Sequence, residues 1–221
     1  MSTFHFERDL VPVDLRPLEV VERKGIGHPD TLADGVAEAI SLAYAEYCQR
    51  EFGVILHHNV DKTAVLGGRA NARLGSCEMV EPHRLIMNGR MSTEFGGRII
   101  DWQSLQREAA IAFLKPSLPR LDTSRWLDFH FYTSASSRSP YWFHPRSMDD
   151  VPDAAAPWAS DTSAFASYWP LSTVERLALE LEGYFYDNRT PRYEAVGQDI
   201  KVMAVRHGSA IVVTMCVPFF A

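Results

Sequence analysis

Apolar residues between positions 30 and 50 recur every three to four residues, and this spacing constrains the fold more than any other feature of the chain. The recurrence is typical of one buried face of a helix and comprises Leu32, Val36, Ile40 and Tyr44. Pro29 suits the first turn of such a helix, and Gly53 suits its end. The sequence therefore predicts a helix over residues 30–50 with one apolar face.

Segments rich in β-branched and aromatic residues surround this helix. They predict strands at residues 18–22, 54–58, 63–68, 84–88 and 126–132. A second helix is expected from Asp101 to about Leu114, where Lys115-Pro116 ends it. Its expected inner face consists of Leu105, Ala109, Ala112 and Phe113.

A capping box opens a third predicted helix. Ser172 and Glu175 have the spacing at which each side chain bonds the other residue's backbone amide. This helix is expected to run to about Tyr186, and its inner face comprises Val174, Leu177, Leu181 and Phe185. Two β-rich runs at 199–205 and 210–217 then predict a hairpin. The recurrence of a helix followed by strands predicts an α+β fold with a repeated helix-on-sheet unit.

The domain organisation follows from this order. We expect an N-terminal arm over residues 1–17 and two α+β repeat regions over residues 18–125 and 126–221. Residues 134–160 are rich in Ser, Pro, Ala and Asp and have neither helical nor strand periodicity. A stretch of this length is long for a plain connection. It is interpreted as a mobile loop or an active-site cover.

Charge and cysteine usage exclude several functional classes. The 22 Lys and Arg residues stand against 28 Asp and Glu residues, so the net charge is −6 and the positive excess that binds a phosphate backbone is missing. The three cysteines are widely spaced, and no apolar stretch approaches the roughly 20 residues that span a bilayer. We expect a soluble cytoplasmic protein that binds neither nucleic acid nor membranes.

His28 and Asp30 lie where the first predicted helix begins. Gly25 and Gly27 precede them and allow close approach of the backbone to a ligand. Amides at a helix N-terminus attract anions, an imidazole can donate to a phosphate oxygen, and a carboxylate can hold Mg²⁺ between phosphates. The motif predicts a polyphosphate site, and the alternative is that both side chains only cap the helix.

Asp61 and Lys62 follow the adjacent histidines His57 and His58. Neighbouring side chains on a strand point to opposite faces, which weakens a zinc interpretation of this histidine pair. Asp61 is the candidate for a metal or a substrate amine, and Lys62 is the candidate for a phosphate. A solvated turn is the competing interpretation.

Two further candidate clusters lie in the second half of the chain. Ser160, Asp161, Thr162 and Ser163 could contact an amine, a ribose or a metal, although the composition is also common in turns. Lys201, which follows Asp199 within a β-rich run, is either a charge that protects an edge strand or a phosphate contact.

Taken in order, these segments resemble the archaeal-type S-adenosylmethionine synthetase (methionine adenosyltransferase) family. The resemblance rests on residues 20–35 (VVERKGIGHPDTLADG), 56–62 (LHHNVDK) with Gly67-Gly68, 161–163 (DTS) with 170–172 (PLS) and Glu175, and 197–203 (GQDIKVM). The first stretch is highly specific, and the match runs from about residue 18 to residue 217.

The resemblance implies that methionine sulfur attacks C5′ of ATP and displaces triphosphate, which is then cleaved to pyrophosphate and phosphate. It implies that His28 stabilises the leaving phosphate oxygen, Asp30 binds Mg²⁺, Lys201 contacts phosphate and Asp161 holds methionine or the nucleoside. Asp61, Lys62, Ser160, Thr162, Ser163 and Asp199 would lie in the substrate cleft. The implied cofactors are Mg²⁺ and, as a further cation, K⁺.

The family's fold consists of three similar repeats, and its active sites lie between two subunits. Nothing in this chain corresponds to the third repeat, so we expect a shortened member that works as a homodimer or with a companion subunit. Ser160 replaces an Asn of the family, and residues 164–169 replace a glycine-rich turn. A divergent enzyme with another thioether or amino-acid acceptor, and a non-catalytic partner of a synthetase, are the alternative hypotheses.

Overall fold

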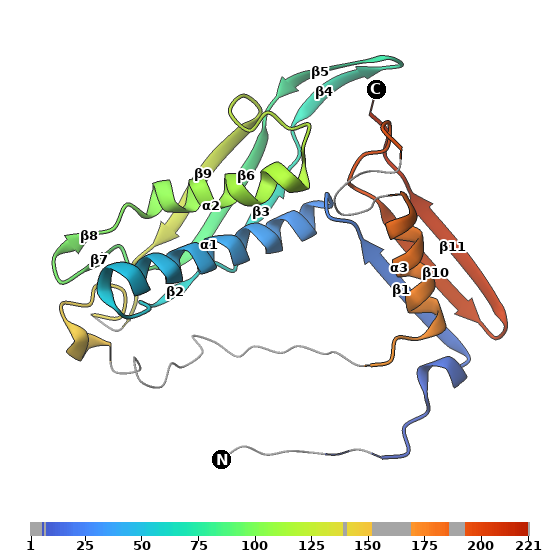
Figure 1. Cartoon of the computed structure of the whole chain (residues 1–221), viewed down its shortest axis with the longest axis horizontal. Coiled ribbons are helices and arrows are strands. Elements are labelled where there is room, and N and C mark those ends of the chain that lie inside the picture. The colour runs from blue at the N-terminus through green and yellow to red at the C-terminus, as the bar shows by residue number, and fades with distance from the viewer. Residues whose placement is uncertain (1–5, 7, 139–140, 152–168, 186–192, 221) are drawn as a thin grey trace. The chain divides into compact units, whose positions relative to one another are not determined.

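The computed structural model describes residues 6, 8–138, 141–151, 169–185 and 193–220. Its elements form two compact units, one made of residues 1–25 and 166–219 and the other of residues 26–165 and 220–221 (Figure 1). We call these unit 1 and unit 2. Helices pack on β-sheets within each unit, so the expected α+β class is confirmed. No helix of the described residues is long and apolar enough to cross a membrane.

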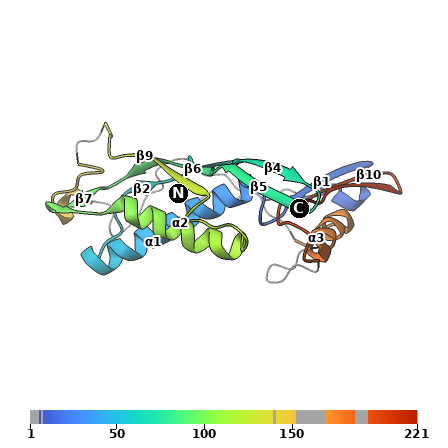
Figure 2. The ribbon, with the colours of Figure 1, turned by 90° about the horizontal axis from the view of Figure 1, so that it is seen from above.

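Unit 1 contains a three-stranded antiparallel sheet and one helix. The strand order is β1 (Leu18–Lys24), β10 (Lys201–His207) and β11 (Ala210–Cys216). The helix α3 (Thr173–Phe185) covers one face of this sheet, and a short 3-10 helix (Val13–Leu15) precedes β1 (Figure 2). The predicted hairpin is confirmed, with Gly208 in its turn at φ 59°.

The capping box at the start of α3 is confirmed. The amide of Ser172 donates to Glu175 Oε2 at 2.7 Å, and the amide of Glu175 donates to Ser172 Oγ at 3.1 Å. Of the expected inner face of α3, Val174 is buried and Leu177, Leu181 and Phe185 are partly buried. The other fully buried residues of the helix are Ala178 and Glu182. The charge of Glu182 is compensated by Arg23 of β1, whose Nε lies 3.0 Å from Glu182 Oε2.

Unit 2 packs two helices on a mixed sheet. The helices are α1 (Pro29–Phe52) and α2 (Trp102–Ser117). In the sheet, β2 (His58–Asn59) and β3 (Ala64–Leu66) both pair antiparallel with β6 (His83–Met91), and β9 (Leu127–Ser134) pairs parallel with β6. Both helices lie on the same face of this sheet (Figure 2).

Two small ribbons complete unit 2. They are β4 (Arg69–Arg73) with β5 (Ser76–Glu81), and β7 (Glu94–Phe95) with β8 (Arg98–Ile99). A 3-10 helix lies at Met148–Asp150. The predicted strand at 54–58 is wrong except at its end, because only His58 enters the sheet. Val54 and Leu56 are nevertheless buried in the core beside α1.

The predicted face of α1 is confirmed, since Leu32, Val36, Ile40 and Tyr44 are all buried. Two details of α2 are corrected: the helix continues past Lys115-Pro116 to Ser117, and Ala112 is exposed. A proline so close to the end removes only one of the last helical hydrogen bonds, which explains why α2 continues through it.

The repeat regions expected over residues 18–125 and 126–221 remain a prediction. Unit 1 contains residues from both of these expected regions, because β1, near the N-terminus, pairs along its whole length with β10. Of the stretch 134–160, residues 139–140 and 152–160 lie outside the described part of the chain.

Close packing of α1 on α2 depends on a glycine. A Cβ atom added at Gly35 would lie 2.0 Å from the ring carbon Cζ of Phe113. We expect Gly35→Ala to lower the free energy of unfolding by about 1–3 kcal/mol, because the ring must move out of a packed position. Urea denaturation measures this.

Gly183→Ala in α3 is the matched control, because nothing lies within 4 Å of its added Cβ. Replacing a helical glycine by alanine without a clash raises stability by about 0.5–1 kcal/mol. Opposite signs at the two positions are expected. Equal stabilisation at both would contradict the close packing at Gly35.

Candidate functional site

His28 is the N-cap residue of α1. Its Nδ1 atom accepts a hydrogen bond from the backbone amide of Asp30 at 3.0 Å, and the residue is only 9% exposed. Since Nδ1 accepts, the proton of the neutral ring is on Nε2. His28 therefore caps the helix, as the simpler interpretation expects, and can also present Nε2–H as a donor at the positive end of a long helix dipole.

Asp30 lies in the first turn of α1 with its carboxylate 63% exposed. Among the described residues, no group of three His, Cys, Asp or Glu side chains could hold a metal ion. A single carboxylate nevertheless fits Mg²⁺, which commonly binds one or two carboxylates and takes its other ligands from substrate phosphates and water. Asp30 could therefore hold a magnesium ion that arrives with a polyphosphate.

Gly25 fixes the start of the glycine-rich segment within unit 1. Its amide donates to the carbonyl of Ile200 at 2.7 Å, and an added Cβ would lie 2.9 Å from the same oxygen. Only glycine allows this approach. The hydrogen bond from Gly25 to Ile200 joins the end of β1 to the segment that leads into β10.

Lys201 begins β10, directly opposite Lys24 of β1 in the register. β10 is the middle strand of its sheet, so the interpretation of Lys201 as an edge-strand charge is wrong. Lys201 and Lys24 share the face of the sheet opposite the buried Val202. Two cations on one face form a region that favours an anion.

Asp199 precedes β10 and has an unusual carboxylate. Its Oδ1 atom is buried, and no hydrogen-bond donor among the described residues reaches it. A buried acceptor without a partner is costly. If Asp199 lies in the substrate cleft, as the resemblance implies, this oxygen could accept a hydrogen bond from a donor group of the substrate.

A cavity of about 540 Å³ lies in unit 2, at the end of the sheet where β2 joins β6. Its polar lining includes Asp61 and Lys62, which the sequence predicts as site residues. Further polar lining residues are Asn59, Asn88, Arg90, Ser134 and Ser137. Arg90 lies in register between Asn59 of β2 and Ser134 of β9. These neighbours on three strands form one wall of the cavity.

Asp61 and Lys62 enter the cavity because the chain leaves the sheet between β2 and β3. Both strands pair antiparallel with the same side of β6, at residues 90–91 and 84–86, so the chain keeps its direction and residues 60–63 bulge out of the sheet between them. In this bulge the amide of Asp61 donates to Asn59 Oδ1 at 3.4 Å. The carboxylate of Asp61 and the ammonium of Lys62 form an ion pair.

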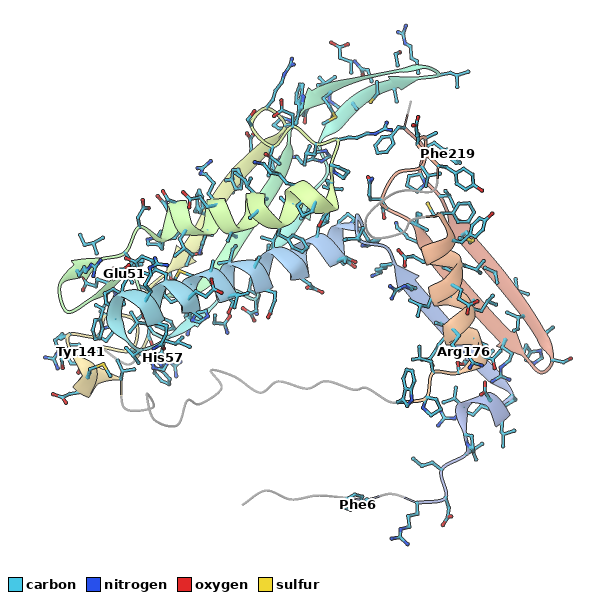
Figure 3. All side chains as sticks on the ribbon, viewed as in Figure 1. Phe6, Glu51, His57, Tyr141, Arg176 and Phe219 are labelled. Carbon is cyan, nitrogen blue, oxygen red and sulfur yellow. The ribbon has the colours of Figure 1, made fainter. Side chains whose placement is uncertain are left out.

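Aromatic side chains also line the cavity. His57 and Trp142 pack edge to face with ring centroids 5.1 Å apart, and Phe143 is buried behind them. Figure 3 shows His57 and Tyr141 at the same end of unit 2, near the C-terminal end of α1. The segment that carries Trp142 is held by Arg146, whose guanidinium binds both oxygens of Asp150 and lies 3.6 Å from the centre of the Tyr141 ring.

His58 lies under the cavity and is fixed in one tautomer. Its Nδ1–H donates to the carbonyl of Leu56 at 2.9 Å, so Nε2 accepts from the hydroxyl of Ser41 at 2.8 Å. Burial lowers the pKa of His58 below its ordinary value of 6.5, although the bond to Leu56 opposes this shift. The ring is therefore neutral at physiological pH.

The lowered pKa of His58 predicts acid sensitivity. Below pH 6.5 the unfolded chain binds a proton that folded His58 does not, so the free energy of unfolding falls as pH falls from 7 towards the folded pKa. The slope is at most about 1.4 kcal/mol per pH unit for one histidine. Burial lowers the pKa of His83 as well, which adds to this loss.

Urea denaturation at pH 7, 6 and 5 measures this effect. His58→Asn keeps a donor for Leu56 but cannot titrate, so we expect lower stability at pH 7 with a shallower dependence on pH. A slope identical to that of the unchanged protein would contradict the assignment of a lowered pKa to His58.

The predicted site residues fall into three places. His28 and Asp30 lie at the N-terminus of α1, Asp61 and Lys62 lie in the cavity, and Asp199 and Lys201 lie in unit 1. The ring of His58 touches Ser41 and Tyr44, which lie roughly 18–22 Å along α1 from Pro29 at 1.5 Å per residue. The cavity and the His28 turn are therefore separate within one chain.

Ser160, Asp161, Thr162 and Ser163 lie outside the described residues. Sequence reasoning also missed several residues of the cavity, among them Asn88, Arg90 and Trp142. Asn88 and Arg90 alternate along a strand, a pattern that could have been read as polar positions on one face of β6. No sequence signal connects Trp142 with them.

Comparisons with known proteins identify the family. The sequence model described as S-adenosylmethionine synthetase (AdoMet synthetase) matches residues 7–221. An uncharacterized protein of Streptococcus pyogenes is 44% identical over 86% of this chain and 49% of its own length. The S-adenosylmethionine synthase of Pyrococcus furiosus is 38% identical over 92% of this chain and 50% of its own length.

A solved S-adenosylmethionine synthetase from Campylobacter jejuni, described as unusual, aligns with 92% of this chain and 49% of its own at 13% identity and a TM-score of 0.42. The chain thus spans about half the length of the curated relatives that it matches. From the extent of the family match, the chain belongs to the S-adenosylmethionine synthetase family.

Proposed function

We propose that this chain is a methionine adenosyltransferase, acting as a homodimer or with a companion subunit. Methionine sulfur would attack C5′ of ATP and release triphosphate, which is then cleaved to pyrophosphate and phosphate. The observation that carries the proposal is the hydrogen bond from the amide of Asp30 to His28 Nδ1, which leaves Nε2–H as a donor at the N-terminus of α1.

Displacement at a carbon atom needs little acid–base help, whereas the leaving triphosphate must be aligned and its charge neutralised. In this proposal His28 donates to the leaving oxygen and Lys201 contacts a phosphate oxygen. Asp30 would hold Mg²⁺, which supplies positive charge to the triphosphate when bound, and K⁺ would be a further cation. Asp199, Ser160, Thr162 and Ser163 would contact substrate, and Asp161 would hold methionine or the nucleoside.

The separation between His28 and the cavity supports a site built from more than one chain. His58, which lines the cavity together with Asp61 and Lys62, contacts α1 at a point roughly 18–22 Å along the helix from Pro29. The resemblance implies active sites between two subunits, which would allow both clusters to contribute. The cysteine usage fits an enzyme of the reducing cytoplasm.

This function is tested by measuring whether the release of pyrophosphate and phosphate requires methionine. The purified chain is incubated with ATP and Mg²⁺ in the presence of K⁺, with and without methionine, and both products are quantified. Release that requires methionine supports the proposal. Equal release without methionine indicates simple triphosphate cleavage, and no release under either condition contradicts activity of this chain by itself.

A further inference from the structure

Helices cover the sheets of the two units to different extents. In unit 2, α1 and α2 lie side by side on one face of the sheet (Figure 2). In unit 1, α3 packs on β1 and β10, and β11 continues the same sheet on the far side of β10 (Figure 1). Among the described residues, unit 1 therefore has one α-helix on its sheet where unit 2 has two.

The side chains of β11 on the α3 side of the sheet are apolar and partly exposed. Val213 pairs with Ala204, which is fully buried beneath α3. Ile211 and Met215 lie on the same face as Val213, because side chains two residues apart on a strand point the same way. Ile211 and Val213 remain 38% and 37% exposed. β11 also lacks the charged residues and proline that commonly protect an edge strand in contact with water, so it fits a covered position better than an open one.

The flank of α3 that faces β11 is apolar as well. Glu182 marks the opposite flank, which lies over β1, because its carboxylate pairs with Arg23. Leu177, Leu181 and Tyr184 lie on the side of the helix away from this ion pair. Tyr184 is 44% exposed, and the two leucines are half-buried. We call the six apolar side chains that continue from α3 onto β11 the α3–β11 strip, namely Leu177, Leu181, Tyr184, Ile211, Val213 and Met215.

The helix and the strand run in the same direction, so the strip follows both of them along their length. α3 begins at the hairpin end of the sheet, because the hydroxyl of Ser172 binds Glu19, which pairs with Arg206. It ends near the other end of β1, where Glu182 reaches Arg23. The 13 residues of α3 span about 20 Å. A partner helix of three to four turns would match this length.

We propose that the α3–β11 strip binds an amphipathic helix of a companion chain, in the way that α2 lies beside α1 in unit 2. The apolar face of this helix covers Ile211 and Val213 and packs against the flank of α3. Glu180 is exposed and lies one turn from both Leu177 and Tyr184, so it borders the strip. Since β11 carries no charge, the partner helix should have Lys or Arg beside its apolar face.

A second copy of this chain does not fit as the occupant. The apolar faces of α1, α2 and α3 are already buried within their own units, so the described part of a second copy has no free amphipathic helix. The proposal deepens the proposed function by assigning the surface that holds a companion subunit, and it rests on that function only in expecting such a subunit. Because its test measures binding without ATP or methionine, failure of the two proposals can be told apart.

Fluorescence anisotropy with two labelled helical peptides tests the proposal on the full chain. Both peptides have about 14 residues and leucines along one face, and the flanking positions are lysine in one and glutamate in the other. The lysine peptide should bind with a saturable curve, and the glutamate peptide should bind about threefold more weakly or worse. Val213→Asn should weaken the lysine peptide about tenfold or more, because it places an unpaired amide under the apolar face. Glu180→Lys should reverse the preference between the peptides.

Val20→Asn is the matched control for the strip. Val20 is 58% exposed, and it lies on the opposite face of the same sheet because its buried neighbour Glu19 faces α3. This variant should leave the affinity for the lysine peptide within about twofold. Ile211→Asn supplies a second variant of the strip, and circular dichroism checks that all variants fold.

Four results would overturn the proposal. They are no saturable binding of the lysine peptide by the unchanged chain, equal affinity of the unchanged chain for both peptides, equal losses in Val20→Asn and Val213→Asn, or a dimer in sedimentation that Val213→Asn converts to a monomer. The last result would identify a second copy as the occupant of the strip.

Discussion

Replacing His28 by alanine is expected to reduce the rate of S-adenosylmethionine formation by about 10²–10³-fold, because under the proposed function the variant loses the donor to the leaving oxygen. The variant also loses the cap of α1, which costs about 1 kcal/mol. Turnover and urea denaturation of the same preparation separate the two effects. A stability loss without a rate loss would leave His28 as a capping residue only.

His28→Asn is the matched control for capping. Asparagine is among the best N-cap residues and accepts from the same backbone amides, but it cannot place an imidazole Nε2–H beyond the helix end. We expect stability close to that of the unchanged protein together with a rate as low as that of the alanine variant. Full activity of His28→Asn would contradict the role of the imidazole.

The largest effect on stability is expected at an ion pair buried in unit 1. Glu19 Oε2 lies 3.1 Å from Arg206 Nη2, the two side chains are only 6% and 11% exposed, and Glu19 Oε1 accepts from the hydroxyl of Ser172. Arg206 also donates to the carbonyls of Val13 and Arg16 at 2.9 Å each. One ion pair thus joins β1, β10, the start of α3 and the 3-10 helix before β1.

Glu19→Ala is expected to lower the free energy of unfolding by about 3–5 kcal/mol, because it leaves the charge of Arg206 buried without a partner. Chemical denaturation measures this loss. Glu81→Ala is the matched control, since its ion pair with Arg69 is exposed and such pairs contribute about 0–1 kcal/mol. Losses of similar size in the two variants would contradict the expectation that breaking a buried ion pair costs more stability than breaking an exposed one.

A double-variant cycle checks the coupling. Arg206→Met alone should also be strongly destabilising, because it leaves Glu19 buried and charged. Glu19→Ala combined with Arg206→Met should cost less than the sum of the two single changes, since no uncompensated charge remains. Additive losses would indicate that the two side chains act independently.

Local sequence signals predicted the elements of this fold well. The spacing of Leu32, Val36 and Ile40 gave the length and buried face of α1, and Ser172 with Glu175 gave the start of α3. These features depend on residues within one or two helical turns, where spacing and geometry are linked directly.

Long-range arrangement was less predictable. β1 pairs with β10, more than 170 residues later, and no local feature of either strand indicates this pairing. The parallel pairing of β6 with β9 brings Arg90 beside Ser134, and neither residue carries a local sign of this contact. Pairing between distant strands depends on the packing of whole elements, which hydrophobic periodicity does not encode.

The same difference applies to the candidate site. His28, Asp30, Asp61 and Lys62 were identified because they occur in short motifs that carry the family resemblance. Trp142 was missed because it lies within a stretch without periodicity and reaches the cavity only through the loop that Arg146 and Asp150 hold. A cavity wall formed by such a loop is visible only in three dimensions.

Mass spectrometry of the product formed from ATP and methionine tests the central claim most directly. The purified chain is incubated with both substrates, Mg²⁺ and K⁺, alongside the His28→Asn variant. We predict S-adenosylmethionine from the unchanged chain and its near absence from the variant. ATP and methionine that remain unconverted by the unchanged chain would contradict the assignment of this chain as an adenosyltransferase by itself.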